Sequence, residues 1–155
     1  MRLSNLLKKD LIITNLTQKD REGILQEMIG FLKKKKLISD HKDLFKKLLE
    51  REKQVTTAIA DGIAIPHCKS KEIEESIIVL GISKEGANFN SINGKPTHIF
   101  FLVISPLELS SHHLQILALV AHMAKKGEHL RDRLLKKESE EEIIKAIREE
   151  ETTHE

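Results

Sequence analysis

Apolar residues recur along this chain in two patterns, as short continuous runs and as stripes at helical spacing. Continuous runs bounded by turn residues are typical of strands that are buried on both faces of a sheet. Four segments have this character and are predicted to be strands or strand-like, namely 11–14, 55–66, 76–82 and 97–105. The strongest is the last, an uninterrupted apolar run that ends before Pro106.

Stripes with a period near 3.6 residues predict helices between these strands. A short helical turn is expected at 3–7. Thr17 is a candidate cap for a helix that ends in the lysines at 33–36, and Ser39 with Asp40 opens the next helix. Glycine and asparagine at 86–94 indicate turns that connect two strands as a hairpin.

The last third of the chain is predicted to be helical. A long helix is expected to begin at the cap Ser110 and to run to residue 126, followed by a shorter helix at 128–136. Ser139 and Glu142 have the spacing of a capping box that opens a final helix, and residues 149–155 are expected to form a frayed tail. For the long helix, the expected apolar face consists of Leu114, Leu117, Ala118 and Ala121.

Strands that alternate with helices, without a linker or a repeat, predict one α/β domain over residues 1–155. The 39% of hydrophobic residues is enough to form a core in a chain of 155 residues. The single cysteine, Cys68, excludes an internal disulfide and fits a reducing cytoplasm. Because no apolar run approaches the roughly 20 residues of a membrane span, a soluble cytoplasmic domain is expected.

The charge balance argues against nucleic acid and membrane partners. The chain has 26 basic and 24 acidic residues, a net charge of +2, and aromatic residues make up only 3%. Neither a strong basic field nor a set of base-stacking rings is therefore expected. The run Lys33–Lys36 is more simply explained as a solvated helix end, where lysine suits the negative pole of the helix dipole.

The candidate chemistry centres on the run Gly62-Ile63-Ala64-Ile65-Pro66-His67. Pro66 has no amide donor, so the chain is expected to leave the sheet there and to carry His67 just past the carboxyl end of a strand. Histidine acts as a neutral nucleophile or as a proton carrier near pH 7. Considered alone, a histidine that only makes a hydrogen bond at a strand end is the simpler interpretation.

Two further residues are candidates for the same site. His113 falls in the first turn of the long helix, on the side of Ile116, and follows a strand end, so it can face His67 across a crevice. Free amides at a helix N-terminus favour an anion over a charged imidazole, which suits a histidine that accepts a phosphoryl group. Arg51 has a guanidinium that can bind a phosphoryl group through paired hydrogen bonds. A surface arginine paired with Glu50 or Glu52 is an equally good interpretation.

The residue patterns of several other kinds of functional site are absent from this sequence. His98, His122 and His129 show no metal-ligand spacing, and Cys68, adjacent to His67 on an extended chain, is expected to point away from it as an inert thiol. The chain has no glycine-rich phosphate loop, dinucleotide turn or nucleophile elbow. Neither a metal nor another cofactor is expected, and a phosphoryl group that reaches His67 has to come from another protein.

These motifs resemble a known family. Arg51-Glu52 followed by residues 57–67, Thr-Ala-Ile-Ala-Asp-Gly-Ile-Ala-Ile-Pro-His, is similar to the enzyme IIA domain of the bacterial phosphoenolpyruvate:sugar phosphotransferase system, in its fructose/mannitol and nitrogen-related class. The segment 113–121, His-Leu-Gln-Ile-Leu-Ala-Leu-Val-Ala, resembles the second signature of that class. The similarity extends over nearly the whole chain and implies a mixed β-sheet flanked by helices on both faces.

The resemblance implies a phosphoryl carrier for sugar uptake. His67 would accept the group from the phosphocarrier protein HPr and pass it to a cysteine of an EIIB partner, with His113 and Arg51 in support. An alternative is a regulatory module of the nitrogen branch, whose phosphorylation state controls binding to a transporter or kinase. The family has glycine where this chain has Ala58 and Ala60, which are expected to be strained if the backbone there needs a positive φ.

Overall fold

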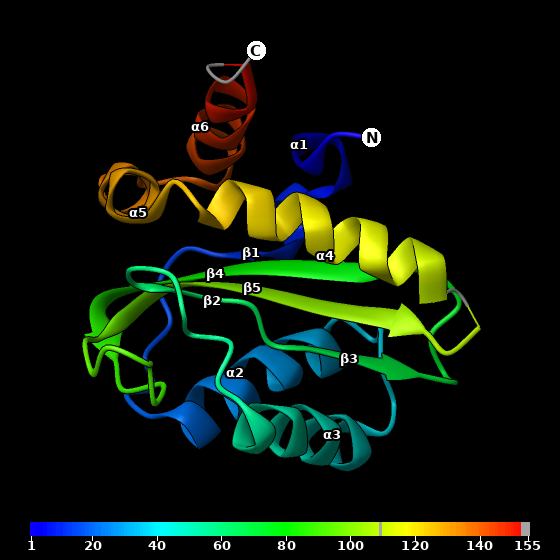
Figure 1. The fold of residues 1–155 in the computed structure, drawn as a ribbon. Helices are drawn as coiled ribbons and strands as arrows, with labels where there is room; N and C mark the ends of the chain where they lie inside the picture. Colours follow the sequence, from blue (N-terminus) through cyan, green and yellow to red (C-terminus); the bar gives the residue numbers. More distant parts are fainter. Residues whose placement is uncertain (109, 153–155) are drawn as a thin grey trace.

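The computed structural model describes residues 1–108 and 110–152 and shows one sheet between two layers of helices (Figure 1). The α/β prediction, with a mixed sheet and helices on both faces, is confirmed. In chain order the elements are α1 Leu3–Leu6, a 3₁₀ turn Lys9–Leu11, β1 Ile12–Ile13, α2 Arg21–Lys34, α3 His41–Gln54, β2 Ile63–Ala64, β3 His67–Ser70, β4 Ile77–Ala87, β5 Thr97–Pro106, α4 Ser110–Ala124, α5 Gly127–Leu135 and α6 Glu140–Thr152.

The two long strands β4 and β5 pair antiparallel at the centre of the sheet, as the predicted hairpin requires. β1 lies parallel to β4, while β2 and β3 both lie parallel to the other side of β5. β4 is longer than its predicted segment 76–82, and only Ile63–Ala64 of the predicted segment 55–66 is a strand. The sheet is thus mixed, and its β2–β3 edge holds the histidine motif.

The prediction that the chain leaves the sheet at Pro66 is wrong. After β2 the chain continues along the same neighbour, and His67, the first residue of β3, pairs with Val103. The Pro66 carbonyl accepts a hydrogen bond from the Val103 amide at 3.0 Å. The missing amide donor is tolerated because this line of strands is a sheet edge, where one side of the backbone needs no partner.

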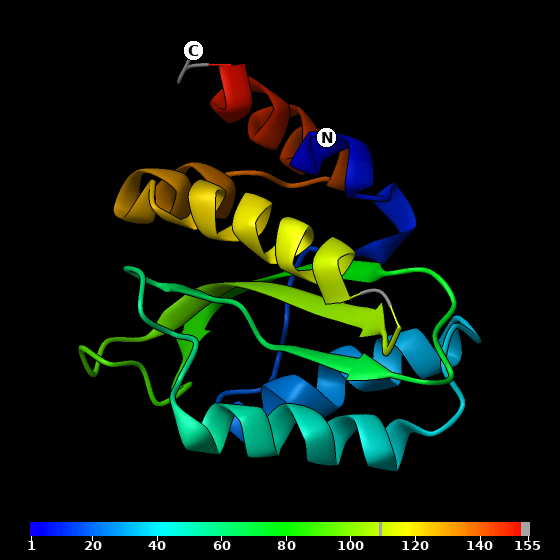
Figure 2. The same cartoon turned by 45° about the vertical axis from the view of Figure 1, so that its right-hand side comes forward.

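Each face of the sheet covers its own hydrophobic core. Figures 1 and 2 show α1, α4, α5 and α6 over one face and α2 and α3 over the other. Ile99, Phe101 and Val103 of β5 belong to the first core, whereas Phe100, Leu102 and Ile104 belong to the second. Successive side chains of a strand point to opposite faces, so a strand covered on both sides is apolar at every position.

Helix α4 is turned differently from the prediction. Of the expected face of Leu114, Leu117, Ala118 and Ala121, only Leu117 packs against the core, where it is partly buried, and the Leu114 side chain is 65% exposed. The buried positions are His113, Ile116, Val120, Met123 and Ala124. Both sides of this helix are apolar, so spacing alone did not identify its core face. α4 therefore presents an apolar face to solvent.

Two of the four predicted helix caps are confirmed. Asp40 caps α3 by accepting from the Asp43 amide at 3.1 Å, and Ser139 accepts from the Glu142 amide at 3.2 Å. Thr17 is not a cap, because Asp20 caps α2 and the Thr17 amide donates to the Glu27 carboxylate instead. α4 begins at Ser110 itself, and residue 109 lies outside the described chain.

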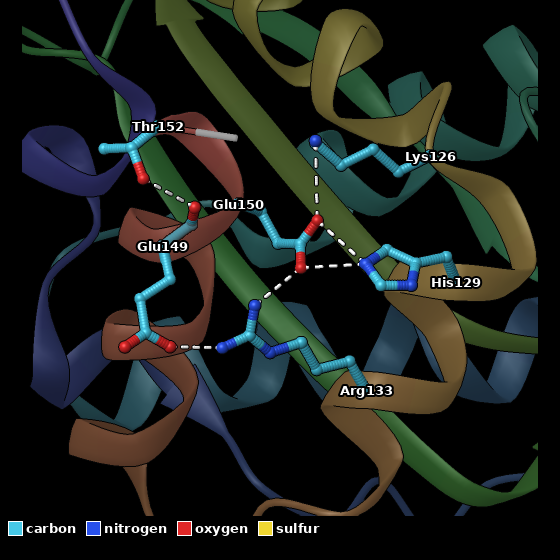
Figure 3. Close-up of polar contacts among 6 residues, drawn as sticks. All are labelled: Lys126, His129, Arg133, Glu149, Glu150 and Thr152. Carbon is cyan, nitrogen blue, oxygen red and sulfur yellow. Dashed lines mark hydrogen bonds and ion pairs between the residues drawn. The ribbon is translucent and has the colours of Figure 1, made fainter. Parts of the chain in front are cut away.

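The prediction that residues 149–155 form a frayed tail is wrong for 149–152, which are the last turn of α6; 153–155 lie outside the described residues. Glu150 is only 2% exposed, forms ion pairs with Lys126 at 3.4 Å and with Arg133 at 2.6 Å, and is hydrogen-bonded to Nε2 of His129 at 2.9 Å (Figure 3). We call these four residues the Glu150 cluster. It fixes α6 to α5 and to the end of α4, so the helix does not fray.

Candidate functional site

The imidazole ring of His67 is held by a hydrogen bond to the backbone two residues earlier in the chain. Its Nδ1 lies 2.7 Å from the carbonyl oxygen of Ile65, and the side chain is partly buried. A carbonyl only accepts hydrogen bonds, so Nδ1 carries the proton that is donated. In the neutral ring the lone pair is then on Nε2, which is the nucleophilic nitrogen.

His113 stands opposite His67, as the sequence predicted. It lies in the first turn of α4, is 4% exposed, and its ring centroid is 5.8 Å from that of His67 at an interplanar angle of 51°. Its Nδ1 is 2.6 Å from the hydroxyl of Ser105 near the end of β5, and Ser105 in turn contacts the Ser76 hydroxyl at 3.1 Å. Two histidines therefore face each other between β3 and the beginning of α4.

Arg51, in the last turn of α3, is the third predicted site residue. Its Nη1 donates to the Val55 carbonyl at 2.7 Å, and the side chain is partly exposed. The alternative interpretation, a surface pair with Glu50 or Glu52, is not observed within the described residues. The charge of Arg51 lowers the pKa of the His67 ring, but in the described chain the one direct contact of the Arg51 side chain is with the Val55 carbonyl and not with either histidine.

Both imidazoles are held in the neutral form. Burial lowers the pKa of His67, the hydrogen bond to Ile65 opposes this shift, Arg51 lowers the pKa further and Glu52 raises it, with a net lowering. Burial lowers the pKa of His113 to about 4, together with the positive charge that His67 carries when it is protonated and the charge of Lys69. A neutral ring beside positive charge can attack an anionic electrophile, because the charge that arrives is matched by the cations.

Lys69 belongs to this neighbourhood and was not predicted. It lies two residues after His67 in β3, hence on the same face of the strand, and its Nζ donates to the Ser110 hydroxyl at 2.8 Å. The i, i+2 spacing was the available signal, but it becomes informative only once β3 is known to be a strand. Cys68 points elsewhere, and burial raises the pKa of its thiol to about 12, as expected of an inert thiol.

The loop before His67 accommodates its alanines without strain. Among the described residues the only non-glycines with positive φ are Lys36 and Asn90, so Ala58 and Ala60 have ordinary backbone conformations. Gly62, with a φ of 77°, takes the one left-handed position of this segment. The expected strain is therefore absent.

No group of three or more histidine, cysteine, aspartate or glutamate side chains in the described chain has the arrangement of a metal site. The site thus consists of two neutral imidazoles, a guanidinium and an ammonium group. These residues can accept and hold a dianionic group on a nitrogen nucleophile.

The sequence matches the family described as "Phosphoenolpyruvate-dependent sugar phosphotransferase system, EIIA 2" over residues 5–150. The chain belongs to this family. It is therefore of the EIIA type of the phosphotransferase system (PTS), and its relatives include a PTS system fructose-specific EIIABC component and nitrogen regulatory proteins.

Individual relatives come from both branches. The chain is 33% identical over 147 residues to the PTS system fructose-specific EIIABC component of Bacillus subtilis (strain 168), which covers 95% of this chain but only 23% of that protein. It is 30% identical over 124 residues to a nitrogen regulatory protein of Bradyrhizobium diazoefficiens, which covers 79% of this chain and 80% of the relative.

Solved structures share the fold. Nitrogen regulatory protein IIA-Ntr from Neisseria meningitidis has a TM-score of 0.82 at 23% identity, over 94% of this chain and 98% of that one. The mannitol IIA of Escherichia coli, in a complex with phosphorylated enzyme IIB, has a TM-score of 0.73 at 17% identity, over 92% and 97% of the two chains. In the described part of this chain, no helix has the length and hydrophobicity to cross a membrane.

Proposed function

We propose that this chain is a histidine phosphoryl carrier in which Nε2 of His67 accepts a phosphoryl group from a phosphorylated HPr-type protein and passes it to a cysteine of an EIIB partner. The observation that carries the proposal is the hydrogen bond from Nδ1 to the Ile65 carbonyl at 2.7 Å. It leaves Nε2 as the free nucleophile near Arg51 and Lys69, neither of which contacts a carboxylate among the described residues.

The transfer is a displacement at phosphorus. The Nε2 lone pair forms the new N–P bond while the N–P bond of the donor phosphohistidine breaks, and the donor imidazole keeps that electron pair. The His67 ring becomes positively charged, and its Nδ1–H remains on the Ile65 carbonyl. In the second step a cysteine thiolate of the acceptor attacks the same phosphorus, and His67 returns to the neutral form.

The neighbours of His67 stabilise the transferred group by position and charge. Arg51 exchanges its bond to a neutral carbonyl for bonds to phosphoryl oxygens, which a guanidinium makes in pairs. Neutral His113, anchored through Nδ1 to Ser105, offers its other nitrogen to the same group. Lys69 and the beginning of α4 add positive potential.

A protein donor fits the surface beside the site. Leu114, the residue after His113, is 65% exposed, and Leu107, just after β5, is 46% exposed. Exposed large apolar side chains around a reactive group are typical of protein–protein contacts. These residues favour a docked phosphoprotein over a small phosphorylated metabolite.

The test is acid-labile labelling by phosphorylated HPr. Wild-type protein is expected to take up one label per chain, and His67→Ala is expected to abolish it. His112→Ala, beside the site but outside the histidine pair, is the matched control and should retain the label. Labelled His67→Ala protein would overturn the proposal.

The regulatory branch is a second candidate, favoured because nitrogen regulatory relatives match this chain over most of their own length. In that case the same phosphohistidine controls binding to a transporter or kinase, because a phosphoryl group brings close to two negative charges. Transfer from the labelled chain to an EIIB cysteine would favour the sugar branch. Stable binding of a protein partner in only one phosphorylation state would favour regulation.

A further inference from the structure

We propose that Glu52 and Thr57 are positioning residues for His67, which fix its reactive tautomer through the backbone of Ile65. The proposal rests on the function proposed for His67 and extends it to two residues outside the histidine–arginine set. Both are buried, with Glu52 at 2% and Thr57 at 7% exposure.

An unbroken series of hydrogen bonds joins the Glu52 carboxylate to the reactive ring. Glu52 accepts from the Thr57 amide at 2.9 Å and from the Thr57 hydroxyl at 2.6 Å. The Thr57 hydroxyl accepts from the Ile65 amide at 3.1 Å, and the Ile65 carbonyl accepts from His67 Nδ1 at 2.7 Å.

Each bond in this series has one allowed direction. A carboxylate only accepts, so the Thr57 hydroxyl uses its one proton toward Glu52 and meets the Ile65 amide with a lone pair. The Ile65 carbonyl in turn only accepts, so His67 must donate from Nδ1. Pro66 adds a restraint, because the residue before proline is confined to extended conformations. The Ile65 amide and the Ile65 carbonyl belong to successive peptide units that meet at one Cα. The bond to Thr57 fixes the first unit and the proline restrains the turn into the second, so together they set the direction of the Ile65 carbonyl and hence the tautomer of His67.

The buried carboxylate of Glu52 is unfavourable for the stability of the fold. It lies in the last turn of α3, where the helix dipole disfavours a negative charge, and within the described residues it forms no ion pair. A buried carboxylate without a cation has a substantial desolvation cost. Its two bonds to Thr57 are charge-assisted, and these are the bonds that hold the loop under His67 in place.

The experiment compares Thr57→Val with Thr57→Ser by ¹⁵N NMR of the His67 ring, at about pH 8, well above the ordinary pKa of histidine. Valine keeps the shape but removes the hydroxyl, whereas serine keeps it. Wild type and Thr57→Ser are expected to show a protonated Nδ1 and a bare Nε2. Thr57→Val is expected to show a mixture of tautomers and a roughly 10-fold slower phosphorylation by phospho-HPr, the factor for losing about one net hydrogen bond.

Glu52→Gln is the second variant, and thermal unfolding of each variant separates misfolding from misplacement. Glutamine has one acceptor oxygen, so it can keep the bond from the Thr57 amide, but its NH2 group has to donate to the Thr57 hydroxyl, which reverses the second bond. Because the Thr57 hydroxyl can still accept from the Ile65 amide, a smaller shift toward mixed tautomers is expected than in Thr57→Val. An unchanged His67 tautomer in folded Thr57→Val and Glu52→Gln would overturn the inference, even with His67 phosphorylated. A changed tautomer in a protein that phospho-HPr never labels would support the positioning and refute the proposed function instead.

Discussion

Two regions of the molecule gather positive side chains, and they differ in what those side chains contact. In the Glu150 cluster a buried carboxylate receives Lys126, His129 and Arg133 (Figure 3). At the histidine site, Arg51 contacts a carbonyl and Lys69 a hydroxyl, both neutral oxygens. The cations of the cluster are paired with a carboxylate, whereas among the described residues neither Arg51 nor Lys69 contacts one. This contrast supports the proposal that an external anion binds at the histidine site.

The difference also appears in the titrating groups. Burial alone would raise the pKa of Glu150, but hydrogen bonds from Arg133, His129 and Lys126 outweigh it, and the net effect lowers the pKa. At the site, burial and nearby positive charge act in the same direction and lower the pKa of both histidines. The Glu150 cluster stabilises the negative charge of a carboxylate that belongs to the fold. The histidine site disfavours positive charge on its two imidazoles.

The largest expected effect is that of Arg51→Ala. Removing the guanidinium takes away hydrogen bonds to the phosphoryl group in the transition state, and the rate of phosphorylation by phospho-HPr is expected to fall about 100-fold. Arg51→Lys should recover part of the loss, because lysine restores the charge without the paired geometry. Chemical unfolding should show a stability change within about 1 kcal/mol, since the side chain makes one bond to a carbonyl.

The converse substitution is Glu150→Gln. It leaves Lys126 and Arg133 without their buried anion, and the free energy of unfolding is expected to fall by about 3 kcal/mol, while the phosphorylation rate stays near that of wild type. Glu149→Gln is the control, because this exposed partner of Arg133 should contribute less than about 1 kcal/mol. Equal effects of Glu150→Gln on stability and on phosphoryl transfer would remove the distinction between the two regions.

The smallest expected effect is on the titration of His67, followed by NMR of its ring carbon-bound hydrogen. The wild-type pKa is expected below 6.5, and Arg51→Ala should raise it, whereas Arg133→Ala should leave it unchanged. Because the folded-state pKa is lowered, protonation of His67 favours unfolding, so this group costs stability as the pH falls below 6.5. A wild-type pKa at or above 6.5 would contradict the electrostatic account.

The Glu150 cluster has its own pH window. Its carboxyl has a lowered pKa in the folded state, so its stabilising contribution is complete above the unfolded value of 4.5 and is lost as the pH falls through the folded one.

The sequence was sufficient for features that depend on the order of residues and elements along the chain. The alternation of apolar runs and stripes gave the α/β class, and the strand ending before α4 gave the encounter of His67 with His113. It failed where an outcome depends on distant partners. The burial of Glu150 needs Lys126, His129 and Arg133 from other helices, and the apolar exposed face of α4 cannot be told from its core face by spacing.

The residues around His67 illustrate the same limit. The sequence suggested Glu52 only as a possible partner of Arg51 and assigned no role to Thr57, because their contacts exist only after the segment between α3 and β2 folds back under Ile65. Pro66 suggested a strand end because its tolerance at a sheet edge depends on which strands pair. The sequence identified the residue types of the candidate site, but the contacts that position His67 depend on the tertiary structure and could not be predicted from the sequence.

The most direct test of the central claim is NMR of ¹⁵N-histidine-labelled protein phosphorylated by phospho-HPr. The account predicts a single phosphohistidine, at His67, with ³¹P–¹⁵N coupling to Nε2 and a proton still on Nδ1. Coupling to Nδ1 of His67, or a phosphoryl group on His113, would contradict it.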